Sequence, residues 1–227
     1  MLAGVLCSCS GGTRAEAAAG DTALILAASE GREDVVNDLV RRGVDVNAGH
    51  DANGDTALMA AIRHAPGLRA VLDDFCRKGV LCKVSFLSRI AWDGVRGAFG
   101  RPAVTPTGVF ERYLRIMTVL LEHGADPNAV TASGATPLTL GASMGHGRVV
   151  RLLLDHGADV NATDGAMGDS TALILAVQNG NSAMVKAVLE KHPDLTPKDR
   201  FGKSALDYAI EENEQWAIDM LRQAGER

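Results

Sequence analysis

Apolar residues recur along this chain in short stripes that match one face of a helix. Val149, Val150, Leu153 and Leu154 follow the spacing i, i+1, i+4, i+5, with charged residues between and around them. Gly157 follows the stripe, and a residue without a Cβ atom readily takes the left-handed conformation that ends a helix. The pattern predicts a short amphipathic helix that ends just before this glycine.

The same frame recurs through the chain. Equivalent stripes are Val35, Val36, Leu39 and Val40 before Gly43; Val71, Leu72, Phe75 and Cys76 before Gly79; Ile116, Met117, Leu120 and Leu121 before Gly124; Met184, Val185, Val188 and Leu189 before His192; and Ala217, Ile218 and Leu221 before Gly225. A hydroxyl residue opens most of the preceding helices, at Thr22, Thr56, Thr136, Thr171 and Ser204. One such helix pair cannot bury its apolar faces alone, so neighbouring copies must stack on it.

The stretch from Gly134 to Asp164, GATPLTLGASMGHGRVVRLLLDHGADVNATD, resembles the ankyrin repeat. The resemblance implies an all-α solenoid of about six stacked helix-turn-helix units with short hairpin loops, over residues 20–227. Arg222 stands where an apolar residue is expected, which suits a terminal cap with a polar outer face. The family's histidine after T-P-L is replaced in every unit, so its usual hydrogen-bond ladder is not expected.

The middle of the array is irregular. The distance from Thr56 to Thr136 is too long for one repeat and predicts two distorted ones. We expect the first to close at Gly79 and the second to begin near Ser85. Its second helix would start at about Phe110, which leaves 94–109, with two prolines and several glycines, as an insertion between helices.

Residues 1–19 are expected to lie outside the array. The run Leu6-Cys7-Ser8-Cys9 resembles a lipoprotein cleavage box with Cys9 as the lipid-bearing residue, and the small residues from Ala15 to Ala19 suit ordinary signal cleavage instead. No basic residue precedes this short apolar run. The pattern predicts a protein in the bacterial periplasm or anchored on the periplasmic side of the membrane, with the cytoplasm as the alternative.

Composition narrows the classes of partner. The net charge is −5 and no basic stripe is present, which argues against a nucleic-acid partner. No apolar run has the length of a membrane span. Twenty-five glycines and an aromatic content of 4% suit thin stacked helices better than a large aromatic core.

Several stretches resemble catalytic or metal-binding motifs without their context. Gly141 to Gly145 matches G-x-S-x-G, but it lies within a predicted helix, whereas a nucleophile elbow needs a strand before it. The sequence Phe201-Gly202-Lys203-Ser204 lacks the earlier glycine of a phosphate-binding loop. We therefore predict no catalytic residue, no metal site and no cofactor. Cys76 occupies an apolar position, and a disulfide to Cys82 stays open if the protein is exported.

The resemblance implies a noncatalytic protein that binds another protein and is a monomer when free. In the family, hairpin tips and the ends of first helices line a concave groove. The predicted partner-binding residues there are Arg63, His64, Met144, Asn179, Asp164, Met167, Arg200 and Phe201. In and beside the insertion they are Trp92, Arg96, Phe99, Arg101 and Phe110, since aromatic and arginine side chains often anchor interfaces. The alternative for Phe99 and Phe110 is that they cover a gap left by a missing hairpin.

Two kinds of partner fit this interpretation. The protein could inhibit a toxin delivered to the periplasm, as an immunity protein does, or it could serve as an accessory or anchoring factor for a periplasmic enzyme, for example in oxidative-stress defence. A hydrolase is the alternative from a different class.

Overall fold

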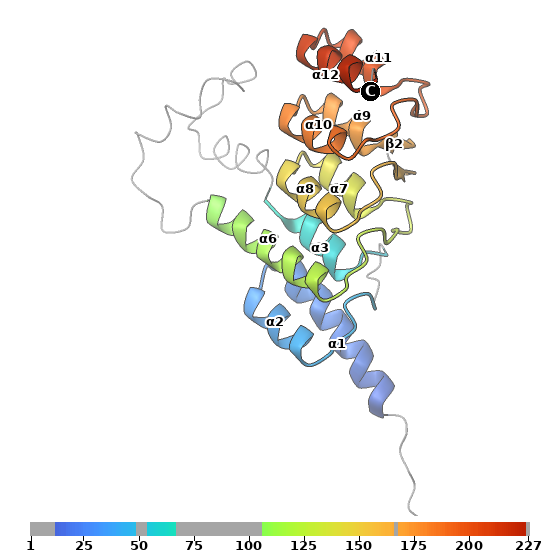
Figure 1. Cartoon of the computed structure of the whole chain (residues 1–227). Coiled ribbons are helices and arrows are strands. Elements are labelled where there is room, and N and C mark those ends of the chain that lie inside the picture. The colour runs from blue at the N-terminus through green and yellow to red at the C-terminus, as the bar shows by residue number, and fades with distance from the viewer. Residues whose placement is uncertain (1–11, 49–53, 67–105, 166–167, 226–227) are drawn as a thin grey trace, which may run out of the picture.

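The computed structural model describes residues 12–48, 54–66, 106–165 and 168–225. Its helices are α1 (Gly12–Ser29), α2 (Glu33–Arg41), α3 (Ala57–His64), α6 (Pro106–Glu122), α7 (Pro137–Ser143), α8 (Gly147–Asp155), α9 (Ala172–Gln178), α10 (Ser182–Leu189), α11 (Ala205–Glu211) and α12 (Gln215–Gly225). Two short strands, β1 (Thr163–Asp164) and β2 (Ser170–Thr171), pair antiparallel. The helices form antiparallel pairs that stack in one direction, which confirms the predicted all-α solenoid (Figure 1).

We call each helix pair a layer and number the layers from the N-terminus. The layers are α1/α2, α3/α6, α7/α8, α9/α10 and α11/α12, the first helix of each pair being the inner helix and the second the outer helix. Hairpin loops join successive layers on one side of the stack, and we call them fingers (Figure 1). Finger 2/3 comprises residues 125–135, finger 3/4 residues 158–170 and finger 4/5 residues 193–203.

Hydroxyl residues begin four inner helices as predicted. The side-chain oxygens of Thr56, Thr136, Thr171 and Ser204 accept hydrogen bonds from the backbone N–H three residues later, which satisfies a donor that the helix itself leaves unpaired. The prediction for Thr22 is wrong, because Thr22 lies inside α1. That helix begins at Gly12 and extends past the end of the stack, so it crosses the expected boundary at residue 20 (Figure 1).

Among the described residues, the middle of the array contains one layer, whereas the sequence predicts two repeats there. Helix α3 packs against α1 on one side and α7 on the other, and its outer partner is α6. The described residues form five layers, where the sequence predicts about six units over the whole chain. The predicted helices near Val71 and Ser85 lie outside the described residues, and the outer position beside α3 is already filled by α6.

Asparagine side chains connect successive layers and confirm this order. Asn47 Oδ1 accepts the N–H of Asp126 at 2.7 Å, and Asn47 Nδ2 donates to the Gly124 carbonyl at 2.8 Å. Asn128 makes the same pair of bonds with Asp159 and Gly157, at 2.7 and 3.2 Å. The two partners Asn47 and Asp126 are 79 residues apart, whereas Asn128 and Asp159 are 31 apart. Asp126 of layer 2 thus lies directly beside Asn47 of layer 1, although 79 residues separate the two in the sequence.

The turn that follows the inner helix of layer 2 differs from the others, because its described residues include no left-handed one. In other layers this turn contains a left-handed residue, such as Gly145 with φ 74° or Gly180 with φ 60°. The equivalent Ala65 is extended, with φ −61° and ψ 127°, as expected for a residue before proline. Residues 67–105 follow Pro66 and lie outside the described residues. The predicted insertion 94–109 ends too late, since α6 begins at Pro106 and residues 106–109 are helical.

Helix α6 is longer than the other outer helices. It has 17 residues, against 9 in α8, and aligning Gly124 with Gly157 leaves residues 106–113 as roughly two extra turns. We call these residues the overhang of α6. Tyr113 in the overhang donates its hydroxyl hydrogen to the Ser29 carbonyl at 2.7 Å, and its ring covers Gly31. The overhang therefore packs on the inter-helix turn of layer 1.

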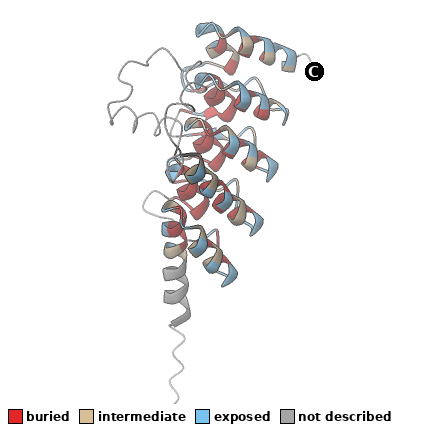
Figure 2. Ribbon diagram, turned by 90° about the vertical axis from the view of Figure 1, so that its left-hand side faces the viewer, coloured by how far each residue is buried: buried red, intermediate tan, exposed pale blue. Residues whose placement is uncertain are grey.

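Buried residues run through all the layers of the ribbon (Figure 2), and their apolar side chains form one continuous core. Leu138 and Leu173 of the inner helices and Met117, Leu153 and Met184 of the outer helices are each at most 2% exposed. Every layer buries its faces against the next, as the repeat pattern predicts. In the described parts of the chain, no helix is long and apolar enough to cross a membrane.

Candidate partner-binding surface

Buried polar side chains hold the turns of fingers 2/3 and 4/5. In finger 2/3, Thr131 is 5% exposed and its hydroxyl oxygen accepts the N–H of Ala135 at 2.9 Å. Asp199 has this role in finger 4/5, where Oδ1 accepts the N–H groups of Phe201 at 2.9 Å and Lys203 at 3.0 Å. These bonds close the loop on itself, so the tip is fixed before any partner arrives.

Asp199 also connects its finger to the inner helix of layer 5. Tyr208 donates its hydroxyl hydrogen to Asp199 Oδ2 at 2.6 Å. Burial would raise the pKa of the Asp199 carboxyl, but hydrogen bonds from Tyr208, Lys203 and Phe201 bring it below its ordinary value. The hydrogen bond to Asp199 raises the pKa of the Tyr208 hydroxyl. The carboxylate therefore stays ionised and keeps the turn closed at neutral pH.

Asp164, one of the predicted partner residues, occupies the same position in finger 3/4. It is 1% exposed, so its carboxylate is not part of the exposed surface. The alignment of Asp164 with Thr131 and Asp199 was the sequence signal for this burial. The neighbouring predicted residue Met167 lies outside the described residues.

The fingers pack directly against one another. A Cβ atom on Gly54 would lie 2.9 Å from the backbone nitrogen of Ala132, and one on Gly168 would lie 2.5 Å from the Arg200 side chain. The Arg200 N–H donates to the Gly168 carbonyl at 2.8 Å. Neighbouring fingers are thus held side by side. Their tips form one continuous edge of the molecule, which we call the finger edge.

Apolar side chains stand exposed on this edge. Phe201 is 66% exposed and Val130 is 57% exposed. The guanidinium carbon of Arg200 lies 4.9 Å from the centre of the Phe201 ring. The structure therefore places two predicted partner residues, Arg200 and Phe201, together on the tip of finger 4/5.

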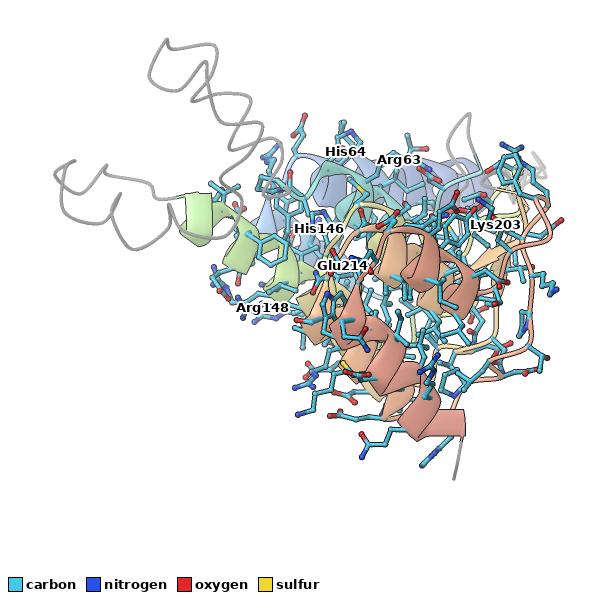
Figure 3. The ribbon with its side chains drawn as sticks, turned by 90° about the horizontal axis from the view of Figure 1, so that it is seen from above. Arg63, His64, His146, Arg148, Lys203 and Glu214 are labelled. Atoms are coloured by element: carbon cyan, nitrogen blue, oxygen red, sulfur yellow. The ribbon has the colours of Figure 1, made fainter. Side chains whose placement is uncertain are left out.

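Inner-helix ends supply the second part of the predicted surface. Arg63 binds both carboxylate oxygens of Asp55, at 2.7 and 3.0 Å, while its own side chain stays 40% exposed. The equivalent positions of layer 5 carry the reverse pair, Lys203 and Glu211. Each pair links the base of a finger to an inner helix. Figure 3 shows Arg63 and His64 along one edge of the stack.

The other predicted inner-helix residues differ in how freely they are presented. His64 is exposed, and its Nδ1 lies 3.0 Å from the Ala60 carbonyl oxygen. Met144 is 37% exposed. Asn179 donates from Nδ2 to the carbonyl oxygens of Ala142 and Leu175, at 2.9 Å each, so its amide joins layers 3 and 4.

Sequence reasoning missed Leu26, which is 55% exposed on α1. Its equivalents Leu140 and Leu175 are only 8% and 6% exposed. Leu26 differs because α1 is the first inner helix and has a neighbouring inner helix on one side only. A pattern shared by all the repeats could not distinguish it.

The predicted residues of the insertion are only partly covered by the structure. Trp92, Arg96, Phe99 and Arg101 lie outside the described residues. Phe110, in the overhang of α6, is half-buried, with its ring centre 5.5 Å from that of His146 and 5.9 Å from the guanidinium carbon of Arg148.

These contacts put Phe110 on the outer-helix side. Figure 3 shows Arg148 away from the edge that carries Arg63. Phe110 thus packs beside the inter-helix turn of layer 3.

The G-x-S-x-G stretch around Ser143 lacks the geometry of a nucleophile elbow. Ser143 is the last residue of α7 and donates its hydroxyl hydrogen to the Leu140 carbonyl at 2.9 Å, whereas a nucleophile elbow lies between a strand and a helix. His146 is 5% exposed, and burial lowers its pKa. Within the described ranges, no three histidine, cysteine or acidic side chains come together as metal ligands do.

Comparison with known families adds one finding. The model of ankyrin repeats in three copies matches residues 3–80, 101–164 and 166–227. These ranges cover most of the chain and include all five layers. The gap at 81–100 falls inside the segment that separates α3 from α6.

Proposed function

This chain belongs to the ankyrin-repeat family, and from that membership we propose that it is a noncatalytic module whose finger edge binds another protein. Repeats of this family generally mediate protein–protein interaction. The observation that carries the proposal is Phe201, a large apolar side chain that is 66% exposed on a turn closed by Asp199. Folding gains nothing from this exposure, whereas an interface gains a rigid anchor.

The arrangement of the edge supports protein binding over binding of a small molecule. The exposed side chains of the predicted surface, among them Val130, Met144 and Phe201, lie on two different fingers and on the end of an inner helix. A small ligand needs a concave site that buries most of its surface. A protein surface can contact such spread anchors at once.

Affinity capture tests this proposal. The tagged chain is incubated with extract of the source organism, beside the variant Phe201→Ser combined with Val130→Ser. We expect specific protein partners on the wild type and a clear loss on the double variant. A matched control is Arg222→Ala, an exposed change on outer helix α12. Equal capture by all three forms, or no capture by any, contradicts binding through the finger edge.

Location is a separate proposal that rests on the sequence alone. The run from Leu6 to Cys9 supports export to the periplasm, with a lipid on Cys9 as one form of attachment. Extension of the reading frame upstream should add basic and apolar residues, and the longer protein should fractionate with the membrane or periplasm. Recovery in the cytosol with an uncleaved N-terminus contradicts export.

Within this proposal the partner is either a toxin that the protein inhibits or a periplasmic enzyme that it assists. The identity of the captured protein separates the two. Loss of the partner's activity on mixing supports inhibition, and retained or raised activity supports an accessory role. We expect the free chain to elute as a monomer in size-exclusion chromatography.

A further inference from the structure

Finger 4/5 differs from its neighbours in charge. Its exposed tip carries Lys198 and Arg200, whereas finger 2/3 has Val130 and Ala132 at the equivalent positions. Most other described cations, such as Arg115 with Glu33, are held in ion pairs. In the described part of the chain, neither Lys198 nor Arg200 forms an ion pair. Two positive charges outside any ion pair therefore stand on one tip of a chain whose net charge is −5. Besides the hydrogen bonds from Ser204, the charge of Lys198 lowers the pKa of the Asp207 carboxyl.

An apolar ring accompanies these charges. The Arg200 guanidinium stacks on Phe201, with 4.9 Å between the guanidinium carbon and the ring centre. A guanidinium stacked on a ring keeps its N–H edges available and can bind a carboxylate through two parallel hydrogen bonds. Phe201 leaves much of its surface for apolar contact. The tip thus combines two cations with an aromatic anchor.

The tip is also rigid. Asp199 accepts hydrogen bonds from the N–H groups of Phe201 and Lys203, and the Gly202 N–H donates to the Asp199 carbonyl at 2.8 Å. The bond from the Arg200 N–H to Gly168 fixes the tip to finger 3/4. A loop already held in one conformation loses little entropy on binding, so its contacts contribute more fully to affinity.

From these observations we propose that finger 4/5 recognises an acidic segment of a partner protein, in which a carboxylate side chain lies next to an apolar one. The carboxylate binds Arg200, with Lys198 adding attraction, and the apolar side chain packs on Phe201. This inference rests on the proposed function and specifies the chemistry of the partner at one finger. Attraction between exposed charges also makes the contact weaken as salt rises.

The test uses the full chain and peptides selected from a random displayed library. We expect selected peptides to be enriched in aspartate or glutamate beside leucine or phenylalanine. In fluorescence anisotropy, Arg200→Ala with Phe201→Ser should weaken binding of a selected peptide about 30-fold or more, the size of a hot-spot loss. The variant places at both positions the residues that finger 2/3 already has, Ala132 and Ser133, so the fold should persist.

Controls separate this inference from the proposed function. Arg222→Ala, an exposed change on outer helix α12, should bind the peptide as the wild type does. Selected peptides without acidic residues, or acidic peptides that bind both forms equally, overturn the inference. If the double variant still captures a native protein, this inference is overturned but the proposed function stands. If neither form captures any protein, the proposed function itself is rejected. Binding of single-stranded DNA or anionic vesicles in place of acidic peptides, through the same two residues, rejects a protein partner at this finger.

Discussion

At the scale of single residues, the backbone conformation after each outer helix explains what the usual glycine of the repeat contributes. Gly43, Gly124 and Gly157 each have a positive φ after an outer helix, and His192 takes the same position with φ 52°. A left-handed conformation costs a residue with a Cβ atom about 1–2 kcal/mol, whereas glycine adopts it freely. Layer 4 therefore carries a local strain that three of the other layers avoid.

This predicts a stabilising substitution. His192→Gly should raise the free energy of unfolding by about 0.5–1 kcal/mol, because the removed strain exceeds the entropy that glycine adds to the unfolded chain. Urea denaturation measures the change. The reciprocal variant Gly157→His should lower stability, and a stable Gly157→His protein would refute the assignment of strain.

A second residue-scale prediction concerns His146. Its Nε2 is buried without a hydrogen-bond partner, and its ring contacts Phe110. Burial lowers its pKa, although a hydrogen bond with the Ala65 backbone opposes this. The unfolded chain then binds the proton more readily than the folded one. Stability is complete above the unfolded pKa of about 6.5 and falls as pH drops from there toward the lower folded pKa.

The variant His146→Leu should lose this part of the acid sensitivity. Thermal denaturation of both proteins across that pH window measures it, and His123→Leu, which removes an exposed histidine, is the control. Since carboxylates also titrate in acid, the comparison rests on the difference between the two melting curves. Parallel losses in the wild type and His146→Leu would count against a neutral buried imidazole.

At the scale of helices, packing between layers supplies most of the stability. Leu153 is 0% exposed in α8, which packs against α7 and α10. Leu153→Ala should therefore lower the free energy of unfolding by about 2–5 kcal/mol, through lost apolar burial and the cavity that remains. Ser143→Ala, at the end of α7, should change it by only a few tenths of a kcal/mol. Equal effects of the two variants in chemical denaturation would contradict this account of the core.

Helix starts and ends could be predicted because they are local. Thr136 and Ser204 cap inner helices, and Gly124 and Gly157 follow outer ones, as the sequence indicates. The pairing of α3 with α6 could not be predicted from such local signals. The stripe that ends at Gly79 has the right local spacing for an outer helix, and only contacts across the insertion decide which helix lies beside α3.

One feature of the sequence did indicate the order of the layers. The three junctions with the pattern D-x-N, which end at Asn47, Asn128 and Asn161, provide the bonds between layers. No such junction follows Gly79, where the sequence continues Val-Leu-Cys-Lys. The asparagine that connects layers is thus absent after Gly79, in agreement with the direct bond from Asn47 to layer 2. Of the candidate site, the exposed Arg200 and Phe201 were predictable, but the burial of Asp164 was recognisable only by alignment of the fingers.

At the scale of the whole molecule, the stack is continuous without the segment between Pro66 and Pro106. Asn47 connects layer 1 to layer 2 directly, and α3 contacts α7 of layer 3. Replacing residues 67–105 by a glycine-serine linker should therefore leave one cooperative unfolding transition and a melting temperature close to that of the wild type. Calorimetry tests this. A drop of several degrees, or two separate transitions, would mean that the segment is part of the stack.

The central claim is that the finger edge of a five-layer stack recognises a protein partner. Isothermal titration calorimetry with the captured partner tests it most directly, using the wild type, Phe201→Ser and the chain with residues 67–105 replaced by the linker. We predict affinity about 30-fold lower for Phe201→Ser at an unchanged melting temperature, the loss of a hot-spot anchor, and near wild-type affinity for the shortened chain. Unchanged affinity for Phe201→Ser together with lost binding by the shortened chain would contradict the claim.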